Sequence, residues 1–194
     1  IYPYGKEAAR AIDAVIDMAN SYGLETKNVG YHAMHAQYVE GGQNAVVMAH
    51  VDVVPAGEGW NSDPYKMTVK DGKIFARGIL DDKGPAIVAL HCLRALKDAN
   101  VPAKRKLRVV LGSSEETGMT DMTEYFAVEQ KPYIGLSPDG EYGVCHCEKG
   151  GLHFTRKGNK VSPVVLSFEA GTVPNAIPFK AICEISCIDS EFES

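Results

Sequence analysis

At residues 44–54 the chain reads "NAVVMAHVDVV", a nearly continuous apolar run rich in valine. Runs of this kind are typical of a central strand that is covered on both faces of a parallel sheet. His50 and Asp52 interrupt the apolar character near the end of the run. We therefore expect a buried strand whose carboxyl end carries a histidine and a carboxylate.

Strand-like and helix-like patterns alternate on both sides of this segment. An Asp-Gly pair within residues 65–78 predicts a hairpin. Strands that alternate with helices predict an α/β fold, a three-layer sandwich around a mostly parallel sheet. The expected helices span 6–20, 84–100 and 121–129, and the further strands span 106–116 and 133–141.

After about residue 148 the pattern changes to strand-like alternation. We read this change as the start of a second, antiparallel domain. The expected domains therefore cover residues 1–148 and 149–194, the second of them incomplete.

Composition excludes several function classes. The 194 residues carry a formal net charge of −5, which disfavours a nucleic acid or an anionic membrane surface as partner. No apolar run approaches the length that crosses a bilayer. Five cysteines, an odd number, favour reduced thiols in a cytoplasmic protein. The paired spacing of a cysteine zinc cluster is absent.

Polar residues recur where the predicted strands end. In open α/β sheets, ligands bind beyond the carboxyl ends of the strands. Each residue has a structural explanation by itself, as a helix cap, a turn former or a core histidine. Together, however, several carboxylates at one sheet edge repel one another unless cations hold them. The set consists of His50, Asp52, Asp81, Asp82, Glu115, Glu116 and Asp139.

Histidine and carboxylates without a thiolate suit zinc, manganese or cobalt. A shared carboxylate could hold two metals about 3.5–4 Å apart, as in hydrolytic dinuclear sites. Of the adjacent Glu115 and Glu116, one can bind metal while the other faces water as general base. Asp52 can orient the imidazole of His50.

Four motifs follow one another in this order: "HVDVVPAGEGWNSDPYKM", "ARGILDDKGP", "LGSSEETG" and "SPDGEY". A weaker fifth, "FEAGTVPNAIP", lies at residues 168–178. In these motifs the chain resembles the dinuclear-zinc dipeptidases of the PepV type. They belong to the superfamily of aminoacylase, carnosinase and glutamate carboxypeptidase. The resemblance implies a zinc peptidase-like catalytic domain followed by the start of an α+β lid domain.

The resemblance also implies roles for individual residues. His50 and Asp139 would bind one metal, Asp81 would bridge both, and Glu116 would bind the second. Glu115 would be the general base that acts on a metal-activated water, and Asp52 would orient His50. Asp82 would shape the backbone after a cis peptide bond, and Asn175 would lie near the substrate. The expected cofactor is Zn²⁺, two ions per full-length subunit, with Mn²⁺ or Co²⁺ as alternatives.

Two other functions stay open. An amide deacylase, of the N-acyl-amino-acid or succinyl-diaminopimelate hydrolase type, would use the same metals and base. The resemblance further implies a ligand histidine, a lid histidine and an arginine beyond the end of this chain. We therefore expect an N-terminal fragment, which by itself could be a catalytically silent metal-binding domain. The expected substrate is a small peptide, and a homodimer is compatible with the sequence.

Overall fold

The computed structural model describes residues 2–39, 41–141, 143–152, 154, 164–171 and 177–186. The chain divides into two compact units. The first comprises residues 1–56 and 60–142, and the second comprises 57–59 and 143–194. Within the described ranges, no helix combines the length and the hydropathy that a membrane span requires.

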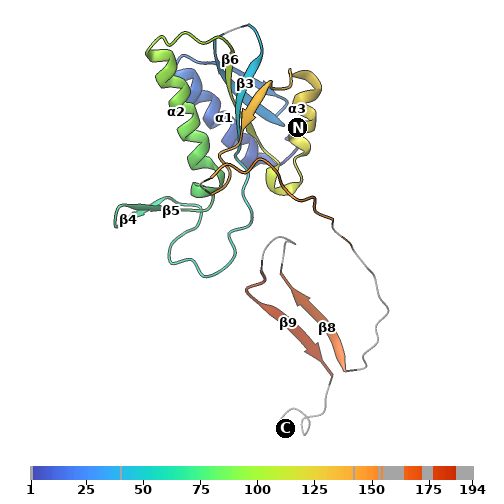
Figure 1. Ribbon diagram of the computed structural model, residues 1–194. Coiled ribbons are helices and arrows are strands. Elements are labelled where there is room, and N and C mark those ends of the chain that lie inside the picture. The colour runs from blue at the N-terminus through green and yellow to red at the C-terminus, as the bar shows by residue number, and fades with distance from the viewer. Residues whose placement is uncertain are drawn as a thin grey trace. The chain divides into compact units, whose positions relative to one another are not determined.

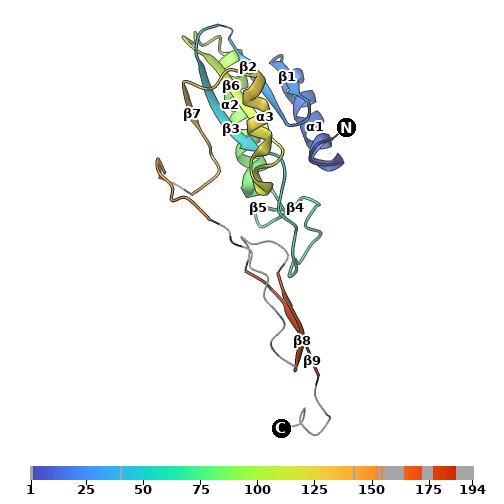
Figure 2. The same cartoon turned by 90° about the vertical axis from the view of Figure 1, so that its right-hand side faces the viewer.

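The first unit is built on a five-stranded sheet with the order β1-β2-β6-β3-β7. β3 (Asn44–His50) runs parallel to both β6 (Lys106–Gly112) and β7 (Ile134–Leu136). β2 (Ala33–Tyr38) is antiparallel to β6, and β1 (Glu25–Val29) is antiparallel to β2. Figure 2 shows β7 and β1 at opposite edges, with β3 and β6 between them. The sheet is therefore mixed, with its parallel part at β6, β3 and β7.

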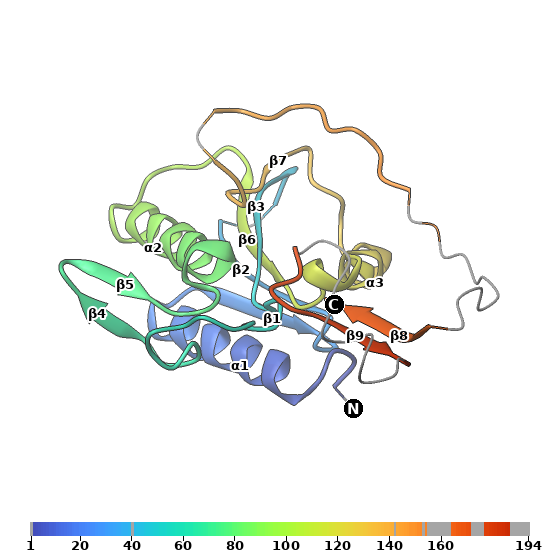
Figure 3. The same cartoon turned by 90° about the horizontal axis from the view of Figure 1, so that it is seen from below.

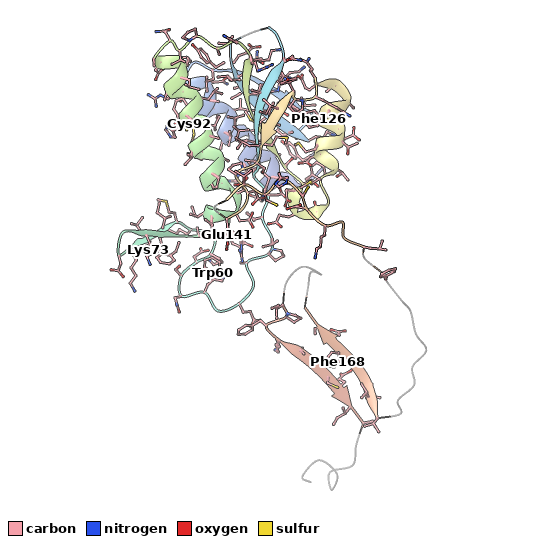
Figure 4. All side chains as sticks on the ribbon, in the orientation of Figure 1. Trp60, Lys73, Cys92, Phe126, Glu141 and Phe168 are labelled. Atoms are coloured by element: carbon pink, nitrogen blue, oxygen red, sulfur yellow. The ribbon has the colours of Figure 1, made fainter. Side chains whose placement is uncertain are left out.

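Helices cover both faces of this sheet. α1 (Lys6–Ser21) and α2 (Gly84–Asp98) lie on one face, and α3 (Thr120–Val128) lies on the other (Figures 1 and 3). In Figure 4, Cys92 on α2 and Phe126 on α3 mark the two sides. α2 begins with Gly84-Pro85, in keeping with the preference of proline for the first helical turn. These three layers confirm the predicted α/β sandwich.

The two faces of the sheet are chemically different. Beneath α1 and α2, the main core cluster contains Ile12, Leu90 and Leu111, none of which has exposed surface. Beneath α3, the apolar cluster is smaller and contains Val110 and Tyr125. The same face also carries buried polar side chains, among them His35, Gln37 and Arg108.

The sequence located most elements but extended the strands too far. The predicted strand 44–54 ends at His50, because the last bond of the parallel ladder joins Val51 N to Gly112 O (2.9 Å). The predicted hairpin is confirmed as β4 (Thr68–Lys70) and β5 (Lys73–Phe75), joined by a turn in which both central residues have positive φ. β1 and β2 were not predicted.

The second unit contains an antiparallel pair of strands. β8 (Val165–Ala170) pairs with β9 (Ala181–Ile185), and Phe168 on β8 (Figure 4) lies opposite Cys183. The domain division at residue 148 stays a prediction.

Candidate metal centre

The site lies where the parallel strands of the first unit end. His50 is the last residue of β3. Glu115 and Glu116 follow β6 in a short turn, η2 (Glu115–Thr117). Asp139 follows β7 and lies within the same unit. Because β3, β6 and β7 are parallel, their carboxyl ends bring these side chains to one edge of the sheet.

Asp81 reaches the same edge from the irregular turn η1 (Ile79–Lys83) ahead of α2. Its backbone is extended (φ −125°, ψ 96°), and the peptide bond to Asp82 is cis, as the resemblance implies. The two aspartates differ in environment. The Asp81 side chain is 54% exposed, whereas Asp82 has no exposed surface. Asp82 Oδ2 accepts a hydrogen bond from His50 N (3.3 Å), which ties this turn to the end of β3.

His50 is at the centre of the site, with 2% of its surface exposed. Its Nε2 lies 3.0 Å from Asp81 Oδ1, 3.6 Å from Asp139 Oδ2 and 3.9 Å from Glu115 Oε2. Its Nδ1 faces Asp52, at 3.0 Å from the backbone oxygen and 3.3 Å from Oδ1. In the tautomer with the proton on Nδ1, the Nδ1–H group donates a hydrogen bond to Asp52. Nε2 is then free to bind a cation among the carboxylates.

The donor atoms form two overlapping groups. His50, Glu115 and Asp139 make one, and His50, Asp81 and Glu116 make the other, with all donors of a group within 4.8 Å of one another. The structure thus brings together all four predicted ligands and the predicted base. It differs from the expectation in one respect, since His50 rather than Asp81 is common to both groups. Asn175 lies outside the described residues.

Unbalanced negative charge dominates the electrostatics. Burial would lower the pKa of His50, but Asp52, Glu115 and Asp139 outweigh it and raise the pKa to about 9. Burial, with help from Asp139, raises the pKa of Glu115, and burial with Asp81 raises that of Glu116. The site thus favours the protonated imidazole of His50, and it disfavours the charged forms of Glu115 and Glu116. Both effects are those of a site that attracts positive charge.

Asp82 shows the same imbalance. Burial, followed by the charge of Asp139, raises its pKa to about 6. Its Oδ1 is buried and has no hydrogen-bond partner in the part of the chain that the structure describes. A buried carboxylate oxygen without a hydrogen-bond partner, close to one histidine and several acidic side chains, is consistent with a site that binds cations. The residues present therefore fit a divalent metal, and their oxygen and nitrogen donors suit zinc, manganese or cobalt.

Asp52 has a wider structural role than sequence reasoning gave it. Besides facing His50, its Oδ1 accepts a hydrogen bond from Glu115 N (3.2 Å) and its Oδ2 one from Glu116 N (3.1 Å). Burial would raise the pKa of Asp52, but His50 and these two amides lower it. One carboxylate therefore holds both the imidazole and the backbone of the glutamate pair, a link that no local sequence pattern signals.

Lys83 was also overlooked. This half-buried lysine follows Asp82, and burial lowers its pKa while the charges of Asp52 and Asp81 oppose that shift. Its ammonium group packs against Gly78, where a Cβ would lie only 2.7 Å from Nζ. The "DDK" sequence thus places one positive charge beside the acidic cluster.

Comparison with known proteins gives a family match over most of the chain. The model described as "Peptidase family M20/M25/M40" matches residues 46–187. This range includes the seven predicted site residues of the first unit and Asn175.

Two bacterial relatives match the chain over a longer range than the family model does. The protein named "Putative dipeptidase YtjP" of Bacillus subtilis is 34% identical over 182 residues, which are 91% of this chain and 39% of that protein. The "Putative dipeptidase SH1171" of Staphylococcus haemolyticus is 36% identical over 183 residues, again 91% and 39% of the two chains. The chain thus spans about two fifths of the length of these relatives.

Solved structures share the fold. Human carnosine dipeptidase 1 matches with a TM-score of 0.54 and 23% identity, over 61% of this chain and 29% of that one. The M20 family metallo-carboxypeptidase Sso-CP2 from Sulfolobus solfataricus matches with a TM-score of 0.59 and 21% identity, over 73% and 34%. At these identities the likeness concerns the fold, which agrees with the α/β sandwich described above.

Proposed function

Because the chain belongs to peptidase family M20/M25/M40, we propose that the full-length protein is a metal-dependent dipeptidase. One observation carries the proposal. His50 Nε2 lies 3.0 Å from Asp81 and 3.6 Å from Asp139, at the sheet edge where the parallel strands end. Relatives at 34% and 36% identity that bear dipeptidase names support a dipeptide as the substrate.

His50 and Asp139 would hold one cation and Glu116 would hold a second, with Asp81 available to both as the resemblance implies. Zinc suits this mixture of imidazole and carboxylate donors, and Mn²⁺ or Co²⁺ accepts the same set. When bound, the cations polarise the scissile carbonyl and lower the pKa of water. Asp52 contributes by accepting the proton of His50 Nδ1, which fixes the ring with Nε2 toward the ligands.

Glu115 is assigned the proton transfers. Its Oε2 lies 3.9 Å from His50 Nε2, close to the centre but beyond direct hydrogen bonding to the ring. The carboxylate takes a proton from the attacking water at Oε2 and returns it to the leaving amine. Burial, with the charges of Asp139 and Glu116, raises the pKa of Glu115. A raised pKa makes the carboxylate a stronger base toward the water proton.

We place the enzyme in the cytoplasm. Cys92, Cys145, Cys147 and Cys183, the cysteines within the described ranges, are all free thiols. Free thiols are usual in a reducing compartment.

The test is hydrolysis of a simple dipeptide by the full-length protein, with and without EDTA, beside hydrolysis of an N-acetyl amino acid. We expect turnover of the dipeptide that disappears with the chelator and returns with Zn²⁺. Preference for the N-acetyl amino acid would reassign the protein as an amide deacylase. Turnover that EDTA leaves unchanged would contradict a metal-dependent reaction.

The same assay on residues 1–194 alone separates the chain from the full-length protein. The cited ligand groups contain one histidine between them. We expect this part to bind a cation and to be catalytically silent.

A further inference from the structure

We infer that Asp121 is a positioning residue: it fixes, through the backbone, the turn from which Glu115 and Glu116 project. The inference rests on the proposed function, because it concerns the base and a ligand of that site. Asp121 is the second residue of α3 and is 1% exposed. Neither the sequence motifs nor the donor groups of the site include it.

The contacts of Asp121 reach outside its own helix. Its Oδ2 accepts hydrogen bonds from Ser113 N (2.7 Å) and Ser114 N (2.9 Å), the two residues that follow β6. Its Oδ1 accepts one from Met122 N (2.8 Å), at the start of α3. Hydrogen bonds that backbone N–H groups donate to a carboxylate are among the stronger ones in proteins. The N-terminus of α3 also favours a negative charge at this position.

Asp121 completes an arrangement that Asp52 begins. Asp52 accepts the amides of Glu115 and Glu116, and Asp121 accepts those of Ser113 and Ser114. Four consecutive amides are therefore held by two carboxylates, one located after β3 and the other on α3. The turn that carries the glutamates is therefore fixed by two separate segments of the chain.

Gly112 leaves the space that the Asp121 carboxylate occupies next to the end of β6. A Cβ on Gly112 would overlap with Asp121 Oδ2 and would lie 2.9 Å from Met122 Cε. Gly112 does not have a positive φ, so its backbone conformation is open to other residues. Space for the carboxylate, rather than backbone freedom, thus accounts for glycine at the last position of β6.

A role confined to capping α3 would need only the bond to Met122. The two hydrogen bonds that Oδ2 accepts from Ser113 N and Ser114 N instead fix the chain immediately before Glu115. A displacement of about 1 Å at a catalytic group can lower the rate about a hundredfold. Loss of Asp121 should therefore affect the chemical step even though its side chain does not reach the donor atoms.

The experiment compares four variants of the zinc-loaded full-length protein: Asp121→Ala, Gly112→Ala, their double variant, and Tyr125→Phe as control. Tyr125 is also a buried residue of α3, but its hydroxyl bonds to His35. For Asp121→Ala we expect kcat to fall about tenfold to a hundredfold with little change in KM. Gly112→Ala should act in the same direction, because the new Cβ displaces the Asp121 carboxylate.

In the double variant the added Cβ no longer meets the carboxylate, so the two losses should not multiply. Tyr125→Phe should lower the melting temperature and keep kcat. If Asp121→Ala behaves like this control, Asp121 is a helix cap only and the inference is wrong. Losses that multiply fully in the double variant also contradict it.

Failure of the proposed function is recognised separately. If the unmodified protein hydrolyses no dipeptide, the decisive readout is amide hydrogen exchange at Glu115 and Glu116 in the zinc-free protein. Faster exchange there in Asp121→Ala, but not in Tyr125→Phe, supports the positioning role. Unchanged exchange overturns it.

Discussion

Two buried histidines of the same sheet have opposite environments. His50 at the end of β3 and His35 in β2 are each 2% exposed. Carboxylates raise the pKa of His50 to about 9 against the effect of burial. Burial, together with the charge of Arg108, lowers the pKa of His35 to about 4. Equal burial therefore gives one histidine that holds a proton firmly and one that stays neutral.

The difference lies in how each region balances its charge. Under α3, Arg108 donates to Glu129 (2.7 Å) and to Gln37 (2.9 Å), and Lys27 donates to the other oxygen of Glu129 (2.6 Å). Tyr125 Oη lies 2.9 Å from His35 Nδ1. This network, which we call the α3 network, pairs its own charges. The candidate metal centre does not pair its charges, so a bound cation would be needed to balance them. The α3 network balances its charges with its own residues.

The largest expected effect concerns the metal centre. Replacing Glu115 by glutamine removes the group that accepts the proton, so kcat should fall about 100- to 10,000-fold. Cation affinity should change little, because the proposed ligands remain. Glu124→Gln on the exposed side of α3 is the matched control and should retain full activity. Full turnover by Glu115→Gln would remove Glu115 from the mechanism.

The second prediction uses the raised pKa of His50. A cation must displace the proton from the imidazole, so binding should release protons below a pH of about 9. Affinity for Co²⁺ should then rise by up to about tenfold per pH unit between pH 6 and 9 and level off above. Titration calorimetry in buffers of different ionisation enthalpy measures both. The same affinity at pH 6 and pH 9 would mean that His50 is not the ligand.

His91→Asn is the control for this pH dependence. His91 lies on α2 and its Nε2 is 3.4 Å from Tyr22 Oη, away from the donor groups of the site. The variant should keep the slope of the wild-type protein.

The convergence of the candidate site residues could be predicted from sequence to a larger extent than the α3 network. These residues follow strands with apolar runs, and strand ends of a parallel sheet converge by topology alone. The sequence could not show that Asp52 holds the amides of Glu115 and Glu116, because those bonds join residues more than 60 positions apart. Nor could it identify Asp121, which reads as an ordinary polar residue at the start of a helix.

β2 was overlooked for a related reason. Its sequence, "AMHAQY", has His35 and Gln37 at alternate positions, a pattern that suggests a solvent-facing side. Both residues are buried, because Arg108 and Tyr125 supply their partners from 71 and 90 positions further along the chain. Buried polar positions that depend on distant partners cannot be distinguished from exposed ones by periodicity.

The third prediction concerns the loss of Arg108 from the α3 network. Arg108→Met leaves the Glu129 carboxylate, whose side chain is 9% exposed, without its nearest buried cation. Removing one partner of a buried ion pair costs about 3–5 kcal/mol of unfolding free energy. We expect the lower end of this range, because Lys27 still donates to Glu129 (2.6 Å). Urea unfolding measures this loss, and kcat of the folded protein should stay near its original value. A large fall in kcat at unchanged stability would show that the two regions are coupled.

Arg94→Met provides the matched control. Arg94 pairs with Asp98 at 3.2 Å, but the two side chains are 45% and 50% exposed. Exposed pairs of this kind contribute about 0–1 kcal/mol. The contrast between the two arginines isolates the effect of burial.

The smallest expected effect tests the neutral histidine. The pKa of His35 is about 4 in the folded chain against an ordinary value of 6.5, so between these values the unfolded chain binds a proton that the folded chain does not. The free energy of unfolding should therefore fall as the pH drops from 6.5 to 4, by at most about 3 kcal/mol from this group. In His35→Asn the amide replaces Nδ1 as partner of Tyr125 and does not titrate. Urea unfolding at pH 7 and pH 4.5 should then show a smaller loss of stability for the variant than for the wild-type protein. Equal losses would mean that other groups cause the acid sensitivity, and that folding does not lower the pKa of His35.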